Sequence, residues 1–222
     1  PAPPETQTLP PPPTIACKCG TGTGGTCKAR LISGQADDAW PQAGGRKYLK
    51  QADEVLMCQC IPTTDCTLEV TNFVYTMDPG ACTPKFGRAS VGNVKLLTPD
   101  VMSFSLELDA LCHFDAGQFV TVQVPGVAGF RGYSMVNFDR GSRRLDFVVK
   151  KKSGGGASEW LFQAGAEGQQ VEWFGPLGTA TFFPTLGKNI LCIAGGSGIT
   201  GMMSVLSRAR QERSFDQYDG EV

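Results

Sequence analysis

The sequence predicts an α+β protein of several domains: a small cysteine-rich module, an antiparallel β-barrel and the start of an α/β domain. Three observations predict this organisation. Six of the nine cysteines fall in the first third of the 222 residues, short runs of β-branched and aromatic residues follow, and a strand, a glycine turn and a helix come last. Each segment has its own residue pattern and is expected to fold around its own core.

The charge and composition exclude several classes of protein. Twenty basic and twenty-one acidic side chains leave a net charge of −1, and 41% of the residues are hydrophobic. Such a chain has no overall field that would attract nucleic acid or an anionic membrane, and no apolar run is long enough to span a bilayer. We expect neither nucleic acid nor a membrane as a partner. Because the N-terminus lacks the basic and apolar regions of a signal peptide, we expect a cytoplasmic protein.

The first third of the chain divides into three parts. Residues 1–14 are expected to be disordered, because seven prolines among the first 13 residues fix the backbone and remove amide donors. The cysteine-rich module covers residues 15–77, and the alternating stretch at 67–71 predicts a strand within it. Residues 78–85 are expected to be a linker, since Asp78, Pro79, Gly80 and Pro84 favour turns.

The cysteines indicate a ligand more than a set of crosslinks. Nine is an odd number, which argues against complete pairing in disulfide bonds within the chain. Ligation of a metal or a cluster is therefore the leading explanation. A zinc site is one alternative, since thiolates bind zinc, although paired Cys-x2-Cys knuckles are absent.

Residues 86–186 predict the antiparallel β-barrel. The clearest strands are expected at 101–108, 118–124, 145–150 and 170–174, with glycine, proline and aspartate between them. One helix, at 157–162, follows three consecutive glycines. Residues 187–222 predict the start of the α/β domain: a buried strand at 189–194, a glycine turn, a helix at 200–212 and a second parallel strand beginning at 220–222. One such unit cannot close the core of an open sheet, so this domain is expected to be incomplete.

The string Arg131, Gly132, Tyr133, Ser134 brings together three groups that suit a flavin. A guanidinium grips phosphate oxygens, a tyrosine ring lies against the isoalloxazine, and a small hydroxyl donates to the ring edge. The alternative is an ordinary strand with one exposed arginine.

Two glycine strings suit phosphate groups. Gly154, Gly155 and Ser158 stand where a glycine loop opens a helix, and helix N-termini attract phosphate; the alternative is a flexible loop capped by Ser153 or Ser158. A second set, Gly195, Gly196, Gly198 and Thr200, forms a turn that lets the backbone approach a dinucleotide pyrophosphate, and the alternative there is a tight packing turn.

Taken together, these strings and the intervening Gly175-Pro176-Leu177-Gly178 resemble the ferredoxin–NAD(P)+ reductase superfamily over residues 86–222. They look most like the reductase components of bacterial aromatic-ring-hydroxylating oxygenases. The resemblance implies an FAD-binding barrel at 86–186 and the start of an NAD-binding domain at 187–222. It implies FAD contacts from Arg131, Tyr133, Ser134, Gly154, Gly155 and Ser158, and nicotinamide-dinucleotide contacts from Gly195, Gly196, Gly198 and Thr200. Tyr133 and Ser134 would set the flavin ring at the reacting position.

The cysteine-rich module resembles the plant-type [2Fe-2S] ferredoxin, a partial β-grasp fold here, that often precedes such a reductase. The resemblance implies Cys19, Cys27 and Cys58 as cluster ligands. Gly24 stands at the remaining ligand position, so assembly of the cluster is an open question. Cys17 or Cys60 as a substitute ligand, and a degenerate module with free thiols, are the alternatives. The hairpin and helix that precede the first ligand in the family are missing, so we expect the chain to be truncated at both ends.

The resemblance implies an NADH-dependent oxidoreductase that passes electrons through FAD and a [2Fe-2S] cluster to an oxygenase component or another electron acceptor. The alternative is a non-catalytic flavin- or metal-binding fragment with a degenerate cluster site. Preference for NADH over NADPH is not readable, because the selecting residue lies at or beyond the end of the chain.

Overall fold

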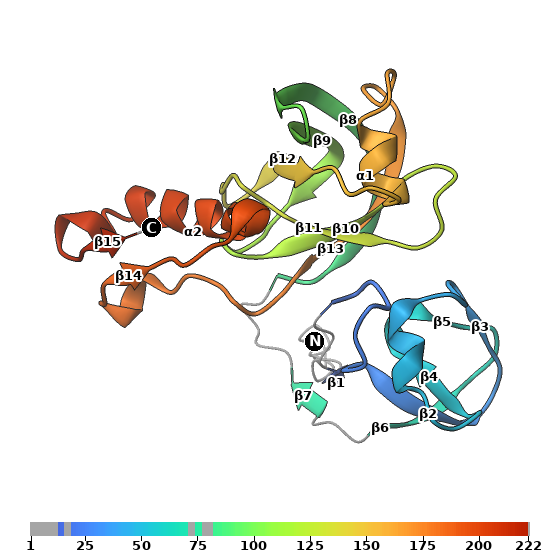
Figure 1. The fold of residues 1–222 in the computed structure, drawn as a ribbon. Helices are drawn as coiled ribbons and strands as arrows, with labels where there is room; N and C mark the ends of the chain where they lie inside the picture. The colour runs from blue at the N-terminus through green and yellow to red at the C-terminus, as the bar shows by residue number, and fades with distance from the viewer. Residues whose placement is uncertain (1–12, 16–18, 71–73, 77–81, 222) are drawn as a thin grey trace, which may run out of the picture.

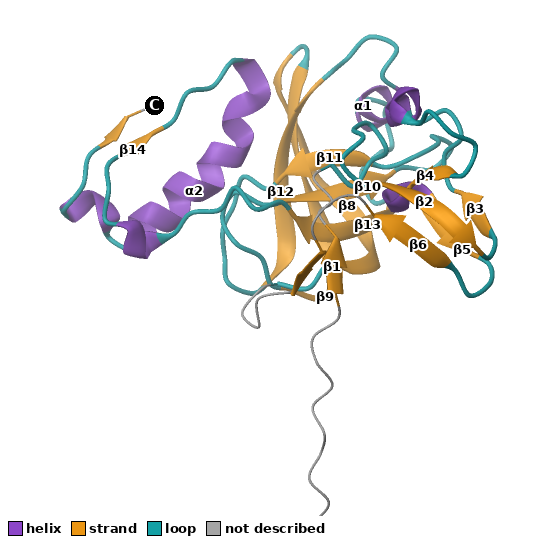
Figure 2. Cartoon of the chain, turned by 90° about the horizontal axis from the view of Figure 1, so that it is seen from below, coloured by secondary structure: helices purple, strands orange, loops and turns teal. Residues whose placement is uncertain are grey.

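The computed structural model of the chain describes residues 13–15, 19–70, 74–76 and 82–221. A curved β-sheet forms the centre, with small N-terminal sheets on one side and a C-terminal helix on the other (Figure 1). Figure 2 shows the same arrangement from below. The curved sheet therefore stands between the two other parts of the chain.

The N-terminal region consists of small antiparallel sheets. In the first sheet β2 lies between β4 and β6, in the second β3 pairs with β5, and in the third β1 pairs with β7. The strands are β1 Pro13–Ile15, β2 Lys28–Ser33, β3 Ala36–Asp38, β4 Glu54–Leu56, β5 Cys60–Pro62, β6 Thr67–Val70 and β7 Val74–Thr76, and two short 3-10 helices are η1 Gly44–Tyr48 and η2 Met57–Gln59. The predicted strand at 67–71 is confirmed by β6. Of the segment expected to be disordered, residues 1–12 lie outside the described residues, while Pro13 and Thr14 pair with β7.

Six antiparallel strands form the curved sheet, a half-barrel with the order β11-β10-β13-β8-β9-β12. The strands are β8 Lys85–Thr98, β9 Val101–Cys112, β10 Phe119–Gln123, β11 Arg131–Ser134, β12 Ser142–Lys150 and β13 Gln170–Leu177. All four predicted strands are confirmed, and β8 and β11 complete the sheet. Beyond β11, the Val136 N–H donates to the Asp146 carbonyl oxygen at 2.9 Å, which joins this segment to β12.

The core of the half-barrel comes from the inward-facing side chains of the strands. Leu106, Met135 and Leu145 are each 0% exposed, and Phe147 is 1% exposed. Leu106 on β9 lies opposite Leu145 on β12. Burial of such side chains from several strands is the main favourable contribution to folding of this region.

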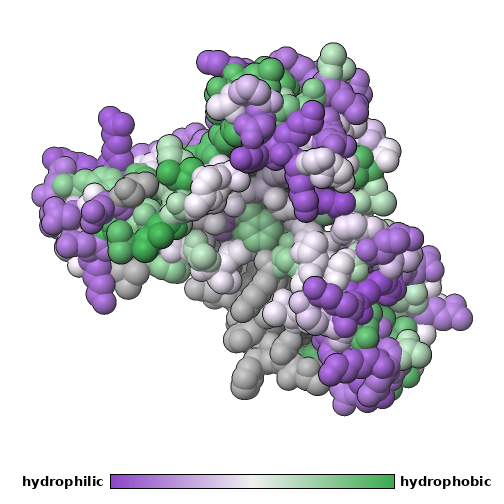
Figure 3. Space-filling view, viewed as in Figure 1, coloured by the Kyte–Doolittle hydropathy of each residue, from purple (hydrophilic) through white to green (hydrophobic). Residues whose placement is uncertain are grey.

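The C-terminal segment contains η3 Pro184–Leu186, β14 Ile190–Leu191, η4 Gly196–Ile199, α2 Thr200–Gln211, η5 Ser214–Asp216 and β15 Gly220–Glu221, and the short helix α1 Gly156–Leu161 lies earlier in the chain. The predicted helices are confirmed by α1 and α2, and β14 pairs in parallel with β15 as expected. The prediction of a buried strand at 189–194 is wrong. Only two residues form β14, Leu191 is 67% exposed and Ile193 is 78% exposed. Figure 3 shows apolar residues at the surface of this C-terminal segment. Within the described residues β14 has one partner strand, so its apolar side chains stay uncovered.

Helix α2 is docked on the half-barrel by buried polar contacts. The Ser204 hydroxyl accepts a hydrogen bond from the Gly117 N–H at 2.9 Å, and Ser204 is 0% exposed. Arg208 forms an ion pair with Asp115 at 2.9 Å and stacks on the Phe138 ring, 5.1 Å from its centroid. These contacts hold the middle and the C-terminal half of α2 against loops of the half-barrel.

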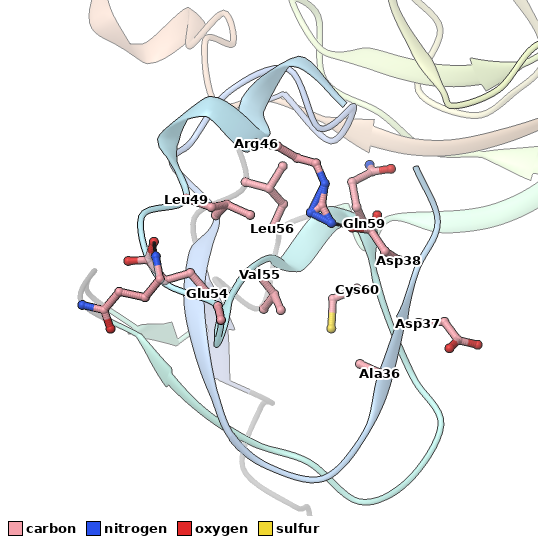
Figure 4. Close-up of a pocket in the computed structure, with 12 residues that line it drawn as sticks. Ala36, Asp37, Asp38, Arg46, Leu49, Glu54, Val55, Leu56, Gln59 and Cys60 are labelled. Carbon is pink, nitrogen blue, oxygen red and sulfur yellow. Dashed lines mark hydrogen bonds and ion pairs between the residues drawn. The ribbon is translucent and has the colours of Figure 1, made fainter. Parts of the chain in front are cut away.

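A cavity of about 380 Å³ lies inside the N-terminal region (Figure 4). Its lining includes the ion pair of Arg46 with Asp38 and the side chain of Glu54. Glu54 accepts hydrogen bonds from the Lys28 ammonium at 2.7 Å and from the Gln51 N–H at 3.2 Å. None of the predicted site residues lines this cavity.

We expect Leu106→Ala to lower the free energy of unfolding by about 2–5 kcal/mol, because it leaves a cavity in a packed core. Urea denaturation followed by circular dichroism measures the change. The matched control is Leu96→Ala, because Leu96 is 61% exposed, and a surface change of this kind alters stability by less than about 0.5 kcal/mol. If both variants lost the same free energy of unfolding, the assignment of Leu106 to the core would be wrong.

We expect Glu54→Gln to lower stability at pH 7 and to remove part of the acid dependence. The hydrogen bond from Lys28 is the largest of the interactions that lower the Glu54 pKa from 4.5 to about 2. The stabilisation by ionised Glu54 is therefore complete above pH 4.5 and is lost as the pH falls towards 2. Urea denaturation across this range should show the wild type and the variant converging at the acid end. Glu69→Gln, at a 54% exposed carboxylate paired with Arg30, should have the smaller effect at pH 7.

Candidate functional site

A cavity of about 690 Å³ lies at the β11 edge of the half-barrel. Six of the ten predicted cofactor-binding residues line it: Arg131, Tyr133, Ser134, Gly154, Gly155 and Ser158. The rest of the lining comes from Cys19, Thr21, Thr23, Phe119, Gly132, Val149, Lys150, Lys152, Gly156 and Ala157. Two strings more than twenty residues apart in the sequence, and part of the N-terminal region, therefore surround one cavity of a size typical of ligand sites.

Tyr133 is held rigidly on β11. It lies opposite Val120 in the antiparallel pairing of β10 with β11. Its ring meets the rings of Phe104 and Phe147 edge-on, with centroids 6.0 and 6.3 Å away. Burial raises the pKa of Tyr133 to about 12, although the positive charge of Arg131 opposes this shift. The phenol is therefore protonated at neutral pH and acts as a hydrogen-bond donor, not as a base.

Arg131 presents its guanidinium group at the mouth of the cavity. Its Nη1 donates to the carbonyl oxygens of Phe130 at 3.1 Å and Ala128 at 3.3 Å. The centre of the guanidinium lies 4.4 Å from the centroid of the Trp40 ring. No ion pair to Arg131 is present within the described residues, so its charge is available to an anion.

The charge of the cavity lining is positive. Arg131, Lys150 and Lys152 line it, and no aspartate or glutamate is among the described residues that do. Lys150 also pairs with Asp100 at 3.2 Å, outside the lining. Arg131 and Lys152 have no ion pair among the described residues, and two such unpaired cations favour a phosphate-bearing ligand.

The glycine loop owes its shape to Ser158. The Ser158 hydroxyl donates to the Gly155 carbonyl oxygen at 2.9 Å and accepts from the Lys152 N–H at 3.0 Å. A Cβ on Gly155 would lie 2.9 Å from the Lys152 carbonyl oxygen, and Gly154 has a φ of 69°. Ser158 therefore holds the loop closed and does not cap α1. The Gly154 N–H is already bonded to Glu159 at 2.9 Å, so the amides left for a ligand are those at the start of α1.

The second glycine turn lies next to this cavity but not in its lining. Gly195, Gly196, Gly198 and Thr200 form η4 and the start of α2. A Cβ built on Gly195, Gly196 or Gly198 would meet no heavy atom within 4 Å, so the turn is open. A Cβ on Gly201 would lie 3.4 Å from the Ser134 hydroxyl oxygen. The turn and the predicted flavin ring site are therefore neighbours.

Cys19 lines the same cavity, and its sulfur is surrounded by donors. The Gly24 N–H donates to the Cys19 sulfur at 3.4 Å. Burial by itself would raise the pKa of the Cys19 thiol, but the hydrogen bonds it accepts lower it below the usual 9.0. The backbone of Thr21 and Gly24 supplies two of these bonds, and the hydroxyls of Thr23 and Thr21 supply the others. The loop is thus built to stabilise a thiolate.

The other two predicted ligands lie together. The sulfurs of Cys27 and Cys58 are 3.4 Å apart, and Cys27 is buried. Among the described residues, however, no group of three or more histidine, cysteine, aspartate or glutamate side chains is arranged to hold a metal. Cys60 lines the other cavity, and Cys17 lies outside the described residues. With Gly24 at the middle ligand position, the described residues do not fit a four-thiolate [2Fe-2S] site.

Several lining residues were not predicted. Lys150 and Lys152 belong to a run of three lysines directly before the glycine loop, which is a readable signal for an anion site. Phe119, which lines the cavity through the pairing of β10, carries no such signal, and neither does Trp40, which is outside the lining and meets Arg131 through packing of the N-terminal region on the half-barrel. No helix of the described residues is long and apolar enough to cross a membrane.

The comparisons with known proteins agree with this geometry. The sequence model of the oxidoreductase FAD-binding domain matches residues 88–182. The chain is 33% identical to the ferredoxin–NAD(P)(+) reductase CarAd of Metapseudomonas resinovorans, over 88% of this chain and 60% of the relative. It is 31% identical to the ferredoxin–NAD(+) reductase component of the alkene monooxygenase system of Xanthobacter autotrophicus, over 86% of this chain and 58% of the relative.

A solved structure, the ferredoxin reductase in carbazole 1,9a-dioxygenase, superposes with a TM-score of 0.76 at 31% identity, over 90% of this chain and 59% of that one. The chain thus spans about 60% of the length of the first of these curated relatives. The half-barrel carries the FAD-binding domain of these proteins. Over most of its length the chain is thus similar to ferredoxin–NAD(P)+ reductases that are components of bacterial oxygenase systems, and residues 88–182 match the oxidoreductase FAD-binding domain.

Proposed function

We propose that this chain binds FAD in the cavity at the β11 edge and belongs to a reductase that takes electrons from NADH and passes them to an oxygenase component or another acceptor. One observation carries the proposal. Arg131, Tyr133, Ser134 and the glycine loop line a single cavity that is positively charged and has no carboxylate among its described lining residues. An extended diphosphate with a flat ring system matches that lining.

The proposed roles follow from where each side chain lies. Arg131 binds the diphosphate through the edge of its guanidinium, and Lys152 adds positive charge beside the glycine loop. Tyr133 holds the ring system with its aromatic face and protonated phenol, and Ser134 provides a small hydroxyl at the same edge. FAD, when bound, supplies conversion between two-electron and one-electron transfer. None of these side chains is required as a general base.

The nicotinamide dinucleotide is assigned to the turn of Gly195, Gly196, Gly198 and Thr200. Support comes from the contact of α2 with Ser134, which brings the turn beside the flavin ring site. Hydride transfer depends on alignment of the two rings, and the contacts of α2 with the half-barrel would hold the glycine turn at a fixed place beside Ser134. We assign residues 86–186 to the FAD domain and 187–222 to the beginning of the NAD-binding domain.

The N-terminal region is assigned as a partial ferredoxin-like module at residues 15–77, with a Pro-rich segment at 1–14 and a linker at 78–85. The thiolate-stabilising loop around Cys19 and the Cys27–Cys58 pair support this assignment. Because Gly24 leaves the donor set incomplete, we assign no electron-transfer step to a cluster here. A second candidate function follows from the same observation: a flavin-binding protein in which the degenerate cluster site prevents electron transfer to an oxygenase.

We expect Arg131→Met to raise the Kd for FAD by about tenfold to a hundredfold, the loss expected for hydrogen bonds to a charged group. Titration of the apoprotein with FAD, followed by quenching of flavin fluorescence, measures the Kd. The matched control is Arg143→Met, because Arg143 lies on the half-barrel, its side chain bonds to the Asp109 carbonyl oxygen alone among the described residues, and it does not line the cavity. Unchanged binding in Arg131→Met would contradict the proposed function.

We expect the wild-type chain to retain little iron after anaerobic incubation with ferrous iron and sulfide, and Gly24→Cys to retain iron and sulfide in equal amounts. A Cβ at position 24 would lie 3.5 Å from the Cys19 sulfur, so the new thiol would form a pair with Cys19 in addition to the pair of Cys27 and Cys58. Visible absorbance and metal analysis read the result. Gly24→Ser is the size-matched control. A stable cluster in the wild type would show that another residue completes the ligand set.

A further inference from the structure

Trp40 links the N-terminal region to the proposed FAD site through a contact with Arg131. Its indole ring lies under the Arg131 guanidinium, 4.4 Å from ring centroid to guanidinium carbon. Tryptophan is the best aromatic partner for a cation, and arginine is the cation that stacks on aromatic rings more often. The two residues are more than ninety positions apart, so the contact exists only when the N-terminal region is packed on the half-barrel.

A second contact holds the ring in this place. Gly129 has a φ of 77°, and a Cβ built on it would lie 2.4 Å from an atom of the Trp40 ring. The indole therefore lies directly on the backbone of the loop that leads into β11. That loop also contacts the glycine loop, because a Cβ on Gly156 would lie 3.1 Å from the Val127 side chain. Trp40 thus supports a segment that leads into Arg131 at one end and contacts the glycine loop before α1.

The backbone of Trp40 is held by hydrogen bonds within the N-terminal region. The Asp38 carboxylate accepts a hydrogen bond from the Trp40 N–H at 2.9 Å and also pairs with Arg46. The Trp40 carbonyl oxygen accepts from the Ala43 N–H at 3.0 Å. Trp40 is half-buried: its backbone is held by its own region of the chain, and its ring lies against Gly129 and Arg131.

The geometry of Arg131 leaves it able to bind an anion while it is stacked. Its hydrogen bonds within the described residues come from Nη1 alone, so Nε and Nη2 keep their donors. Stacking uses the face of the guanidinium, whereas hydrogen bonds to phosphate use its edge. The two interactions are compatible and act on the same group.

We propose that Trp40 is a positioning residue for the FAD diphosphate: by stacking on Arg131 it orients the guanidinium and makes FAD binding depend on docking of the N-terminal region. The inference rests on the proposed function, because Arg131 is the group through which Trp40 acts. The dependence is reciprocal, so bound FAD also stabilises the docked arrangement.

The test is a double-mutant cycle in the 222-residue chain, with the Kd for FAD measured by flavin fluorescence. Trp40→Met fills similar space without a ring and should raise the Kd by about threefold to thirtyfold, while Trp40→Phe should restore most of the affinity. In an Arg131→Met background, Trp40→Met should have no further effect. Tyr48→Met is the matched control, since Tyr48 lies beneath Lys47 in the same region and lines no part of the cavity.

The outcomes separate the two proposals. If Arg131→Met leaves the Kd unchanged, the proposed function fails. If Arg131→Met weakens binding but Trp40→Met does not, or weakens it equally in both backgrounds, the inference is overturned and the proposed function stands. If circular dichroism shows that Trp40→Met is unfolded, the same cycle is run with Trp40→Phe, for which a smaller coupling is expected. Zero coupling in that cycle also overturns the inference.

Discussion

The antiparallel pairing of β11 with β10 is the constraint on which the rest of the site depends. β11 is a four-residue strand, and this register holds Tyr133 opposite the buried Val120 and Arg131 opposite Val122. A slip by one residue would turn every side chain of the strand to the other face of the sheet. The register is secured by the core beneath it, where Phe104 and Phe147 leave the tyrosine ring little freedom.

The glycine loop is held in the conformation that lines this cavity by the hydrogen bonds of the Ser158 hydroxyl with Lys152 and Gly155. Ser158 ties the loop to the first turn of α1. The result is a cavity with walls of different chemistry: an aromatic ring and a hydroxyl along the strand, positive charge and glycine backbone along the loop. A third wall is the sulfur-bearing loop around Cys19, so a bound ligand would lie between the half-barrel and the N-terminal region.

The sequence predicted those elements whose own residues show a periodic pattern or a recognisable string. The alternation on β9 and β12 reflects one buried face, and the strings around Arg131 and Gly154 were recognisable from residue type and order. Trp40 was not predictable, since its partner is distant in sequence and is met only through packing of two regions. Residues 189–194 were predicted to form a buried strand because most of them are apolar. An apolar run does not show whether another element packs on it, and Leu191 and Ile193 are in fact exposed.

The uncovered apolar side chains on β14 have a consequence for handling the polypeptide. Leu191 lies on β14 and Ile193 follows that strand, and within the described residues β14 and β15 pair only with each other, so the outer edges of this small sheet have no partner strand. Such an edge is a template for intermolecular strand addition. Self-association at high concentration should therefore start from this C-terminal segment, and polar replacements at these two positions are the direct route to a monodisperse sample.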